Sequence, residues 1–202
     1  MRLPFSESGD VLASLAKVVE VLEEGGVLLV PTESFYGLAA DPSRTAAVES
    51  IRQLKGRPEE LGLPVLCADW GQVEDLVIIP ERFRVKLSRI WPAALTVVLP
   101  AREKIPAAAH DTVAVRIPDH RRLRALLYRC GPLTGTSANR HGEPPCVTVD
   151  DAIRSLTSAP DLALDGGRTA GGEPSTLVDL TGEFPRILRP GRVPWDDRYP
   201  ES

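Results

Sequence analysis

Short apolar runs alternate with polar turns along the whole chain, a pattern typical of an α/β protein. Between residues 10 and 24 apolar side chains recur at helical spacing, Asp10 can cap the start, and glycines 25–26 end the run. The same spacing predicts a helix over 43–54, with Gly56 just beyond its end. Further helical segments are expected at 71–77, 80–90 and 149–157.

The remaining apolar runs are short and rich in β-branched residues, which favours buried strands. The clearest of them are 27–30, 95–99 and 112–117. Asp119 is then expected to cap a basic helix that reaches Arg129. Other strands are expected at 64–68, 161–164, 175–180 and 186–189. Because the sequence shows no repeat and no linker-like shift in composition, we expect one α/β domain over residues 1–202, with strands too irregularly spaced for a repeating βαβ ladder.

The composition fits a cytosolic globular protein. The chain has 202 residues, of which 43% are hydrophobic and 26% charged, which excludes a mainly disordered chain. No apolar run approaches the length that spans a bilayer, and the first residues have no signal-peptide core, so no membrane association is expected. The three cysteines, Cys67, Cys130 and Cys146, form no C-x-x-C pair and are interpreted as structural thiols in a reducing compartment.

The charge is unevenly distributed along the sequence. A formal net charge of −4 argues against non-specific nucleic-acid binding by the whole surface. Residues 81–130, however, hold 11 Lys and Arg against 4 Asp and Glu. Such asymmetry fits either a basic face or an ordinary solvated surface, and the sequence alone leaves both open.

The common catalytic signatures are missing from this sequence. It has neither a G-x-x-x-x-G-K-[ST] phosphate loop nor an H-E-x-x-H zinc motif. The segment 135–139 imitates a G-x-S-x-G nucleophile elbow, but Asn139 stands where the last glycine is required. The histidines follow no metal-ligand spacing, so no protein-only metal site is expected.

Polar loops that follow apolar segments remain as the candidate chemistry. They are rich in hydroxyl groups, lysine and arginine, and strand ends are where α/β folds place their ligands. Arginine offers a planar fork to phosphate oxygens and lysine a point charge. With no covalent nucleophile and no metal cage, this set predicts an anionic ligand such as a nucleotide.

The loops and their neighbouring segments also resemble a known family. The resemblance is carried by PTESFYGL, KGRP, WPAALT, TVAVRIPDH, TSANRHGEP, STLVD and ILRPG, in that order along the chain. Together they resemble the Sua5/YrdC/YciO family, the L-threonylcarbamoyladenylate synthases of tRNA modification. The resemblance covers about residues 12–193, and its most distinctive part is the K-x-R motif combined with S-x-N.

The resemblance implies a fold and a reaction. The fold is a single YrdC-like α/β domain, a twisted mixed β-sheet flanked by helices with a large concave basic cavity. The activity is that of a nucleotidyltransferase that converts L-threonine, bicarbonate and ATP, with Mg²⁺, into L-threonylcarbamoyladenylate and pyrophosphate. The threonylcarbamoyl group then reaches adenosine 37 of tRNA through a downstream threonylcarbamoyl-transferase complex. The substrate supplies the nucleophile, so the protein needs only to position groups and to neutralise charge.

The resemblance assigns the nucleotide side of the site to the two motifs. Catalytic and ATP-binding roles fall to Lys55, Arg57, Ser137 and Asn139. Arg189 is expected at the α-phosphate, and Thr112 is expected to add an ATP contact. Lys55 and Arg57 are expected to be exposed in the cavity, so that replacing either lowers turnover and leaves stability nearly unchanged.

The amino-acid side is assigned in the same way. Ser34 aligns with a threonine-contacting position of the family, and Arg116 is expected to pair with the substrate carboxylate. Thr32 and Tyr36 are expected to shape the threonine pocket.

Several positions depart from the family pattern. Leu61 and Leu66 stand where the family often has an Asn that contacts ATP and a His that contacts threonine. His141 and Pro145 stand where serines are usual, and Ala93 stands for a glycine. These departures affect the amino-acid assignment more than the nucleotide assignment.

Two alternatives therefore stay open at this point. One is a divergent paralogue of the same fold with an altered acceptor substrate. The other is a non-catalytic module that binds tRNA or double-stranded RNA through the basic stretch 81–130. The resemblance also predicts the short form of the family, with only the tail 194–202 after the matched region.

Overall fold

A computed structural model describes residues 1–5, 11–56 and 62–196 of the chain. Helices form where the apolar spacing predicts them, although their ends differ by a few residues. Their bounds are α1 (Val11–Glu23), α2 (Thr45–Lys55), α3 (Trp70–Leu76), α4 (Glu81–Ile90), α5 (Arg121–Cys130) and α6 (Val149–Ser155). The mixed α/β class is confirmed.

Local capping explains two of the helix ends. Gly56 ends α2 in the left-handed conformation, with φ 58°, as the sequence predicts. The expected cap of α5 is wrong, because Nδ1 of His120, rather than the Asp119 carboxylate, accepts the N–H of Leu123 at 3.1 Å. An imidazole nitrogen that carries no proton satisfies a free helix N–H as an oxygen acceptor does.

The strands divide into two mixed sheets instead of the single sheet that the resemblance implies. One has the order β1 (Arg2–Pro4), β9 (Leu162–Asp165), β2 (Leu28–Pro31), β3 (Tyr36–Ala39) and β8 (Thr136–Ser137). The other has the order β11 (Arg186–Arg189), β10 (Thr176–Asp179), β5 (Leu95–Pro100), β6 (Thr112–Arg116), β4 (Val65–Leu66) and β7 (Leu133–Thr134). The first is called the five-stranded sheet below, and the second the six-stranded sheet.

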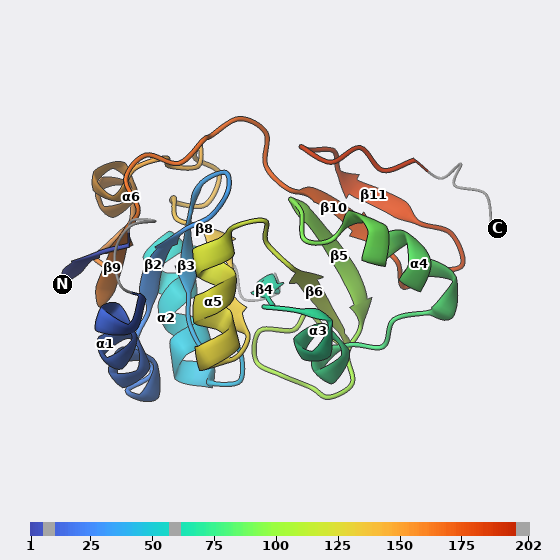
Figure 1. The fold of residues 1–202 in the computed structure, drawn as a ribbon, viewed down its shortest axis with the longest axis horizontal. Helices are drawn as coiled ribbons and strands as arrows, with labels where there is room; N and C mark the ends of the chain where they lie inside the picture. The colour runs from blue at the N-terminus through green and yellow to red at the C-terminus, as the bar shows by residue number, and fades with distance from the viewer. Residues whose placement is uncertain (6–10, 57–61, 197–202) are drawn as a thin grey trace.

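The two sheets lie beside each other, and the chain passes between them several times (Figure 1). The segment between β9 and β10, orange in the view, runs across the top of the molecule from the five-stranded to the six-stranded sheet. Helices α1, α2 and α5 lie with the five-stranded sheet, and α3 and α4 with the other. The loops at the junction of the sheets are therefore drawn from distant parts of the sequence.

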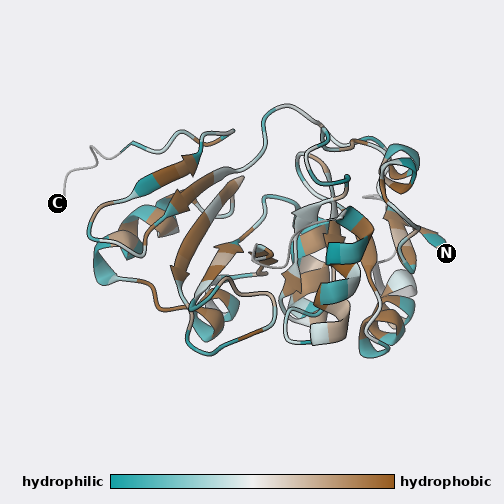
Figure 2. Ribbon diagram, turned by 180° about the vertical axis from the view of Figure 1, so that it is seen from behind, coloured by the Kyte–Doolittle hydropathy of each residue, from teal (hydrophilic) through white to brown (hydrophobic). Residues whose placement is uncertain are grey.

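Apolar residues from both sheets and the inner helix faces form the core. Ala47, Val48, Ile51 and Leu54 make the buried face of α2, as their spacing predicts. In Figure 2 the strands are mainly brown, whereas α2, which lies in front of the five-stranded sheet in this view, shows teal, hydrophilic stretches. Burying one large aliphatic side chain contributes roughly 1.5–3 kcal/mol, so the many leucines and valines at near-zero exposure hold the sheets in place.

Three further properties bear on function. Cys67, Cys130 and Cys146 are free thiols, and burial raises the pKa of each, Cys67 most, so none is activated as a nucleophile. No helix within the described ranges is long and apolar enough to cross a membrane. Those ranges also contain no group of three or more acidic, histidine or cysteine side chains that could hold a metal ion.

Candidate active site

The tight turn between β2 and β3 carries the first group of predicted site residues. The Thr32 hydroxyl donates to the Phe35 carbonyl at 2.7 Å and accepts the N–H groups of Ser34 and Phe35, each at 3.2 Å. A threonine that bonds its own turn in this way fixes the loop without a helix or sheet. The Ser34 side chain is buried, and its hydroxyl lies 3.4 Å from that of Thr32. Thr32 thus orients the turn that presents Ser34.

Lys55, at the end of α2, is placed differently from the expectation. It is only 2% exposed, which corrects the prediction that it lies exposed in a cavity. Its ammonium donates to the Ser137 carbonyl and, at 2.7 Å, to the Asn139 carbonyl. A buried ammonium needs such acceptors, and the S-x-N loop supplies them from its backbone. Lys55 therefore holds the shape of the loop that carries Ser137 and Asn139; these three residues are called the Lys55 region.

Asn139 is buried, and only part of its side-chain amide is hydrogen-bonded. Its amide nitrogen donates to the carbonyls of Arg140 at 2.9 Å and Glu143 at 2.7 Å. Its Oδ1 atom is buried and has no partner in the described part of the chain. An unpaired buried acceptor costs roughly 1–3 kcal/mol and favours a ligand that brings a donor.

Arg116, at the end of β6, meets Glu33 from the turn after β2. The two side chains form an ion pair and are only 9% and 12% exposed. Because β2 and β6 belong to different sheets, this contact bridges the sheets. Burial and the positive charges of Arg189 and Arg192 lower the pKa of Arg116 to about 10, so it stays charged at neutral pH.

Arg189 and Arg192 complete this second group. Arg189 donates through Nη2 to the Ser175 carbonyl at 2.8 Å, and Arg192 donates through Nη1 to the Glu33 carbonyl at 3.1 Å. Gly191 lets the segment between them approach closely, because a Cβ there would lie 2.3 Å from the Pro174 carbonyl oxygen. Glu33, Arg116, Arg189 and Arg192 are called the Arg116 region.

The two regions are neighbours through β3. Gly37 of β3 pairs with Ser137 of β8, and the Ala138 N–H donates to the Tyr36 carbonyl at 2.8 Å. Three residues before Tyr36, the same chain presents Glu33 to Arg116. The turn is also fixed from outside, because the Gly171 N–H donates to the Ser34 carbonyl at 2.7 Å. The structure thus places five of the predicted residues, Ser34, Lys55, Arg116, Ser137 and Asn139, around one hairpin.

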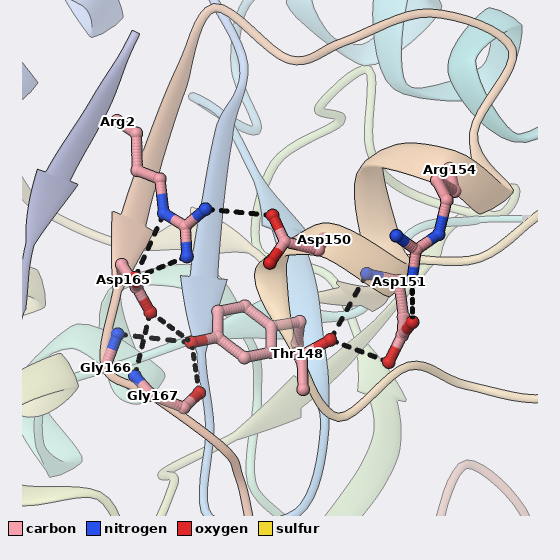
Figure 3. Close-up of polar contacts among 9 residues, drawn as sticks. Arg2, Thr148, Asp150, Asp151, Arg154, Asp165, Gly166 and Gly167 are labelled. Carbon is pink, nitrogen blue, oxygen red and sulfur yellow. Dashed lines mark hydrogen bonds and ion pairs between the residues drawn. The ribbon is translucent and has the colours of Figure 1, made fainter.

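Tyr36 uses its hydroxyl to anchor a loop. The hydroxyl donates to the Gly167 carbonyl at 2.7 Å and accepts the Gly166 N–H at 3.1 Å. Figure 3 shows this turn beside Asp165, which also holds Arg2 at 2.7 Å. Burial, helped by the charge of Asp165, raises the pKa of Tyr36 to about 12. Tyr36 therefore ties β3 to the start of the segment that crosses between the sheets.

The structure does not bring Thr112 to this group. Thr112 begins β6 whereas Arg116 ends it, which separates them by roughly 13 Å at the rise of an extended strand. Its hydroxyl donates to the Ala109 carbonyl at 2.9 Å. Arg57 and Leu61 lie outside the described residues. Leu66 is 1% exposed and packs in the core, where a Cβ on Gly135 would lie 2.3 Å from its Cγ.

Sequence reasoning missed Glu33 and Arg192. Glu33 lies in the PTES segment beside Ser34, and its polar position straight after a strand was the available signal. Its partner is 83 residues away, so only the fold reveals the pairing.

Comparison with known proteins agrees with the sequence resemblance. A family model for the Sua5, YciO and YrdC proteins, described as "Telomere recombination", matches residues 20–191. The threonylcarbamoyl-AMP synthase of Bacillus subtilis is 36% identical over 185 residues, which cover 89% of this chain and 54% of that protein. The synthase of Vibrio vulnificus is 34% identical over 188 residues, covering 90% of this chain and 100% of that protein.

Solved structures lead to the same family. The structure of Pyrococcus abyssi Sua5 complexed with L-threonine superposes with a TM-score of 0.87 at 33% identity, over 95% of this chain and 57% of that one. The structure of Escherichia coli YciO has a TM-score of 0.84 at 24% identity and supports the fold alone. This chain spans about half the length of the B. subtilis and P. abyssi proteins. The matched region, the fold and the identity over most of the chain together show that this chain belongs to the Sua5/YciO/YrdC family.

Proposed function

We propose that this chain is a threonylcarbamoyl-AMP synthase, a nucleotidyltransferase that forms L-threonylcarbamoyladenylate and pyrophosphate from L-threonine, bicarbonate and ATP. The observation that carries the proposal is the convergence of Ser34, Arg116, Ser137 and Asn139 on one hairpin. This convergence occurs in a chain one third identical to a Sua5 whose structure contains L-threonine. Relatives of similar length also carry the synthase name.

The amino acid binds in the Arg116 region in this proposal. Arg116 offers a guanidinium to the carboxylate of threonine. Ser34 comes from the turn that also carries Glu33, the partner of Arg116. Low exposure strengthens such a contact, because less water competes for the charges. Thr32 and Tyr36 serve by fixing the turn and the crossing segment, and neither hydroxyl is needed as a ligand.

The nucleotide binds along the Lys55 region and the neighbouring arginines. The unpaired Oδ1 of Asn139 accepts a hydrogen bond, so it suits a ribose hydroxyl or the adenine amino group better than a phosphate. Ser137 lies beside it on β8. We expect Arg189 and Arg57 to bind the phosphates and to stabilise the charge that develops when the carbamate oxygen attacks the α-phosphorus. Lys55 stabilises the S-x-N loop through hydrogen bonds to its backbone carbonyls. Thr112 remains a proposed ATP contact.

Magnesium fits this site as an ion carried by the nucleotide. Mg²⁺ is bound mainly by phosphate oxygens, waters and one or two carboxylates, and the described residues offer no dedicated acidic cage. When bound, the ion neutralises charge on the phosphates. The chain itself supplies the arginines and the backbone that orient the triphosphate.

The cellular context follows from the proposed reaction. The labile adenylate would pass to a downstream threonylcarbamoyl-transferase complex that modifies adenosine 37 of tRNA in the cytoplasm. Direct RNA binding is the weaker alternative, because several basic side chains of α4 are already engaged. Arg84 pairs with Glu74 and Glu81, and Lys86 stacks on Trp195. An altered acceptor remains the second enzyme candidate, because Leu66 is a buried apolar residue.

The experiment is a pyrophosphate-release assay on the purified chain. Release from ATP that requires both L-threonine and bicarbonate supports the proposal, and mass spectrometry should then detect the threonylcarbamoyl adenylate. Release that prefers another amino acid would favour the altered acceptor. Salt-sensitive tRNA binding with no turnover would favour the RNA-binding module and contradict the synthase.

A further inference from the structure

Glu33 has no role in the function described so far, although it is the direct partner of Arg116. Its carboxylate is largely buried, with 12% of the side chain exposed, and it comes from the turn after β2. An ion pair on the surface contributes little to stability. When an ion pair is buried, its charges interact strongly, and removing one partner leaves an uncompensated buried charge. The pair therefore needs an explanation beyond general surface charge.

The ion pair leaves one atom of each partner unused. Oε2 of Glu33 and Nε of Arg116 are both buried, and neither has a hydrogen-bond partner in the described part of the chain. An arginine and a carboxylate can satisfy each other through two parallel hydrogen bonds, whereas a single one is formed here. The same ion pair thus offers one free buried acceptor and one free buried donor.

The surrounding charge favours a second carboxylate at this pair. Arg189 and Arg192 lie near enough to lower the pKa of Arg116, and Glu33 is the one acid of the Arg116 region. Three guanidinium groups with one carboxylate leave a positive surplus that an anionic ligand group neutralises. The free Nε of Arg116 is a suitable donor for such a group, and the free Oε2 of Glu33 suits a cationic one.

An α-amino acid carries these two charges on adjacent groups around one carbon. We propose that Glu33 receives the amino group of the amino-acid substrate while Arg116 receives its carboxylate, so that Glu33 selects for amino acids over other carboxylates. This inference rests on the proposed function, in which the chain uses L-threonine. The turn that carries Glu33 is held by Thr32 from within and by Gly171 from outside, so the carboxylate is positioned before the ligand arrives.

The test compares L-threonine with 3-hydroxybutyrate, which keeps the carboxylate and the hydroxyl but lacks the amino group. Calorimetric titration of the full chain is repeated with Glu33→Gln, which keeps the size of the side chain and removes its charge. We expect a loss of threonine affinity of at least about 30-fold, with 3-hydroxybutyrate binding unchanged or tighter. In the pyrophosphate assay the same variant should raise the KM for threonine and leave that for ATP unchanged.

Two further variants keep the test interpretable. Glu49→Gln removes another arginine-paired glutamate, on α2, and should alter neither affinity. Glu33→Asp keeps the charge and shortens the side chain, so its threonine affinity should fall between those of the wild type and Glu33→Gln. If Glu33→Gln folds poorly, the threonine affinity of Glu33→Asp is compared with that of the wild type alone and should be lower.

Three outcomes would contradict the role proposed for Glu33. If Glu33→Gln weakens both ligands equally, Glu33 only supports Arg116 and the inference is wrong. If it weakens neither, Glu33 does not contact the ligand and the inference is also wrong. If the wild type neither binds L-threonine nor releases pyrophosphate with it, the proposed function fails first, and the inference that depends on it falls as well.

Discussion

Two of the predicted site residues, Lys55 and Arg116, are buried cations that are held in different ways. Lys55 is surrounded by neutral acceptors, since its ammonium donates to two backbone carbonyls of the S-x-N loop. Arg116 is held by the charged side chain of Glu33, and both partners keep an unused polar atom. The first cation is bound to the loop it supports, whereas the second retains capacity for a ligand.

We therefore propose that Lys55 supports the structure of the site and that Arg116 binds the ligand. A buried charge whose bonds lead to the chain's own backbone fixes local structure, and its removal should disturb folding as well as activity. A buried charge that keeps an unpaired donor can form a hydrogen bond with a ligand. The Lys55 region and the Arg116 region should therefore respond differently when their charges are removed.

The largest effect is expected for Arg116→Gln. It leaves Glu33 as a buried carboxylate without its ion-pair partner, which should lower the free energy of unfolding by about 3 kcal/mol and threonine affinity by at least about 100-fold. Urea denaturation and calorimetry measure the two effects. Adding Glu33→Gln should restore most of the stability but not the threonine affinity. A double variant that is no more stable than Arg116→Gln would contradict the coupling of the two side chains.

Lys55→Ala should have the next largest effect. The Ser137 and Asn139 carbonyls lose a buried donor, so we expect a loss of about 2 kcal/mol in unfolding free energy together with a fall in turnover of at least about 100-fold. Lys17→Ala is the matched control, because Lys17 forms an exposed pair with Glu20 and should change stability by less than about 0.5 kcal/mol. Unchanged stability of Lys55→Ala would mean that this lysine does not support the loop.

Tyr36→Phe should have an intermediate effect, of about 1.5 kcal/mol, because the Gly166 and Gly167 backbone groups lose the hydroxyl. Burial raises the pKa of Tyr36 to about 12, above the value near 10 of an unfolded chain. Its contribution to stability is therefore complete below pH 10 and is lost as the pH rises toward 12. Denaturation curves across this range should show a smaller alkaline loss for Tyr36→Phe than for the wild type, and equal losses would refute the assignment.

The smallest effect concerns the start of α5, away from both regions. His120→Ala removes the acceptor for the Leu123 N–H and should cost about 1 kcal/mol of stability without changing turnover. Asp119→Ala, which removes the cap that the sequence favours, should stay within about 0.5 kcal/mol. The reverse order of the two variants would restore the sequence-based expectation.

Local chemistry made much of the fold predictable. The spacing of apolar residues located α2, and Gly56 marked its end because glycine enters the left-handed conformation easily. The strand β3 was missed, because its four residues show no alternation and its place depends on pairing with β2 and β8. The division into two sheets also depends on long-range pairing that no short segment encodes.

The candidate site shows the same contrast between features that local sequence predicts and features that depend on long-range contacts. The family motifs predict site roles for Arg116 and Ser34, but the burial of Lys55 depends on contacts with a loop 82 residues away. For the same reason the role of Glu33 beside Arg116 could not be read from the turn alone. Motifs name residue types, whereas burial and partners are properties of the assembled chain.

The most direct test of the division between the two regions is a pair of titrations on the Glu33→Gln, Arg116→Gln double variant, which removes the ion pair without leaving an unpaired charge. We predict that it loses L-threonine affinity by at least about 100-fold while its affinity for a non-hydrolysable ATP analogue stays within about threefold of the wild type. An equal loss of both ligands, or a loss of the ATP analogue alone, would contradict the account.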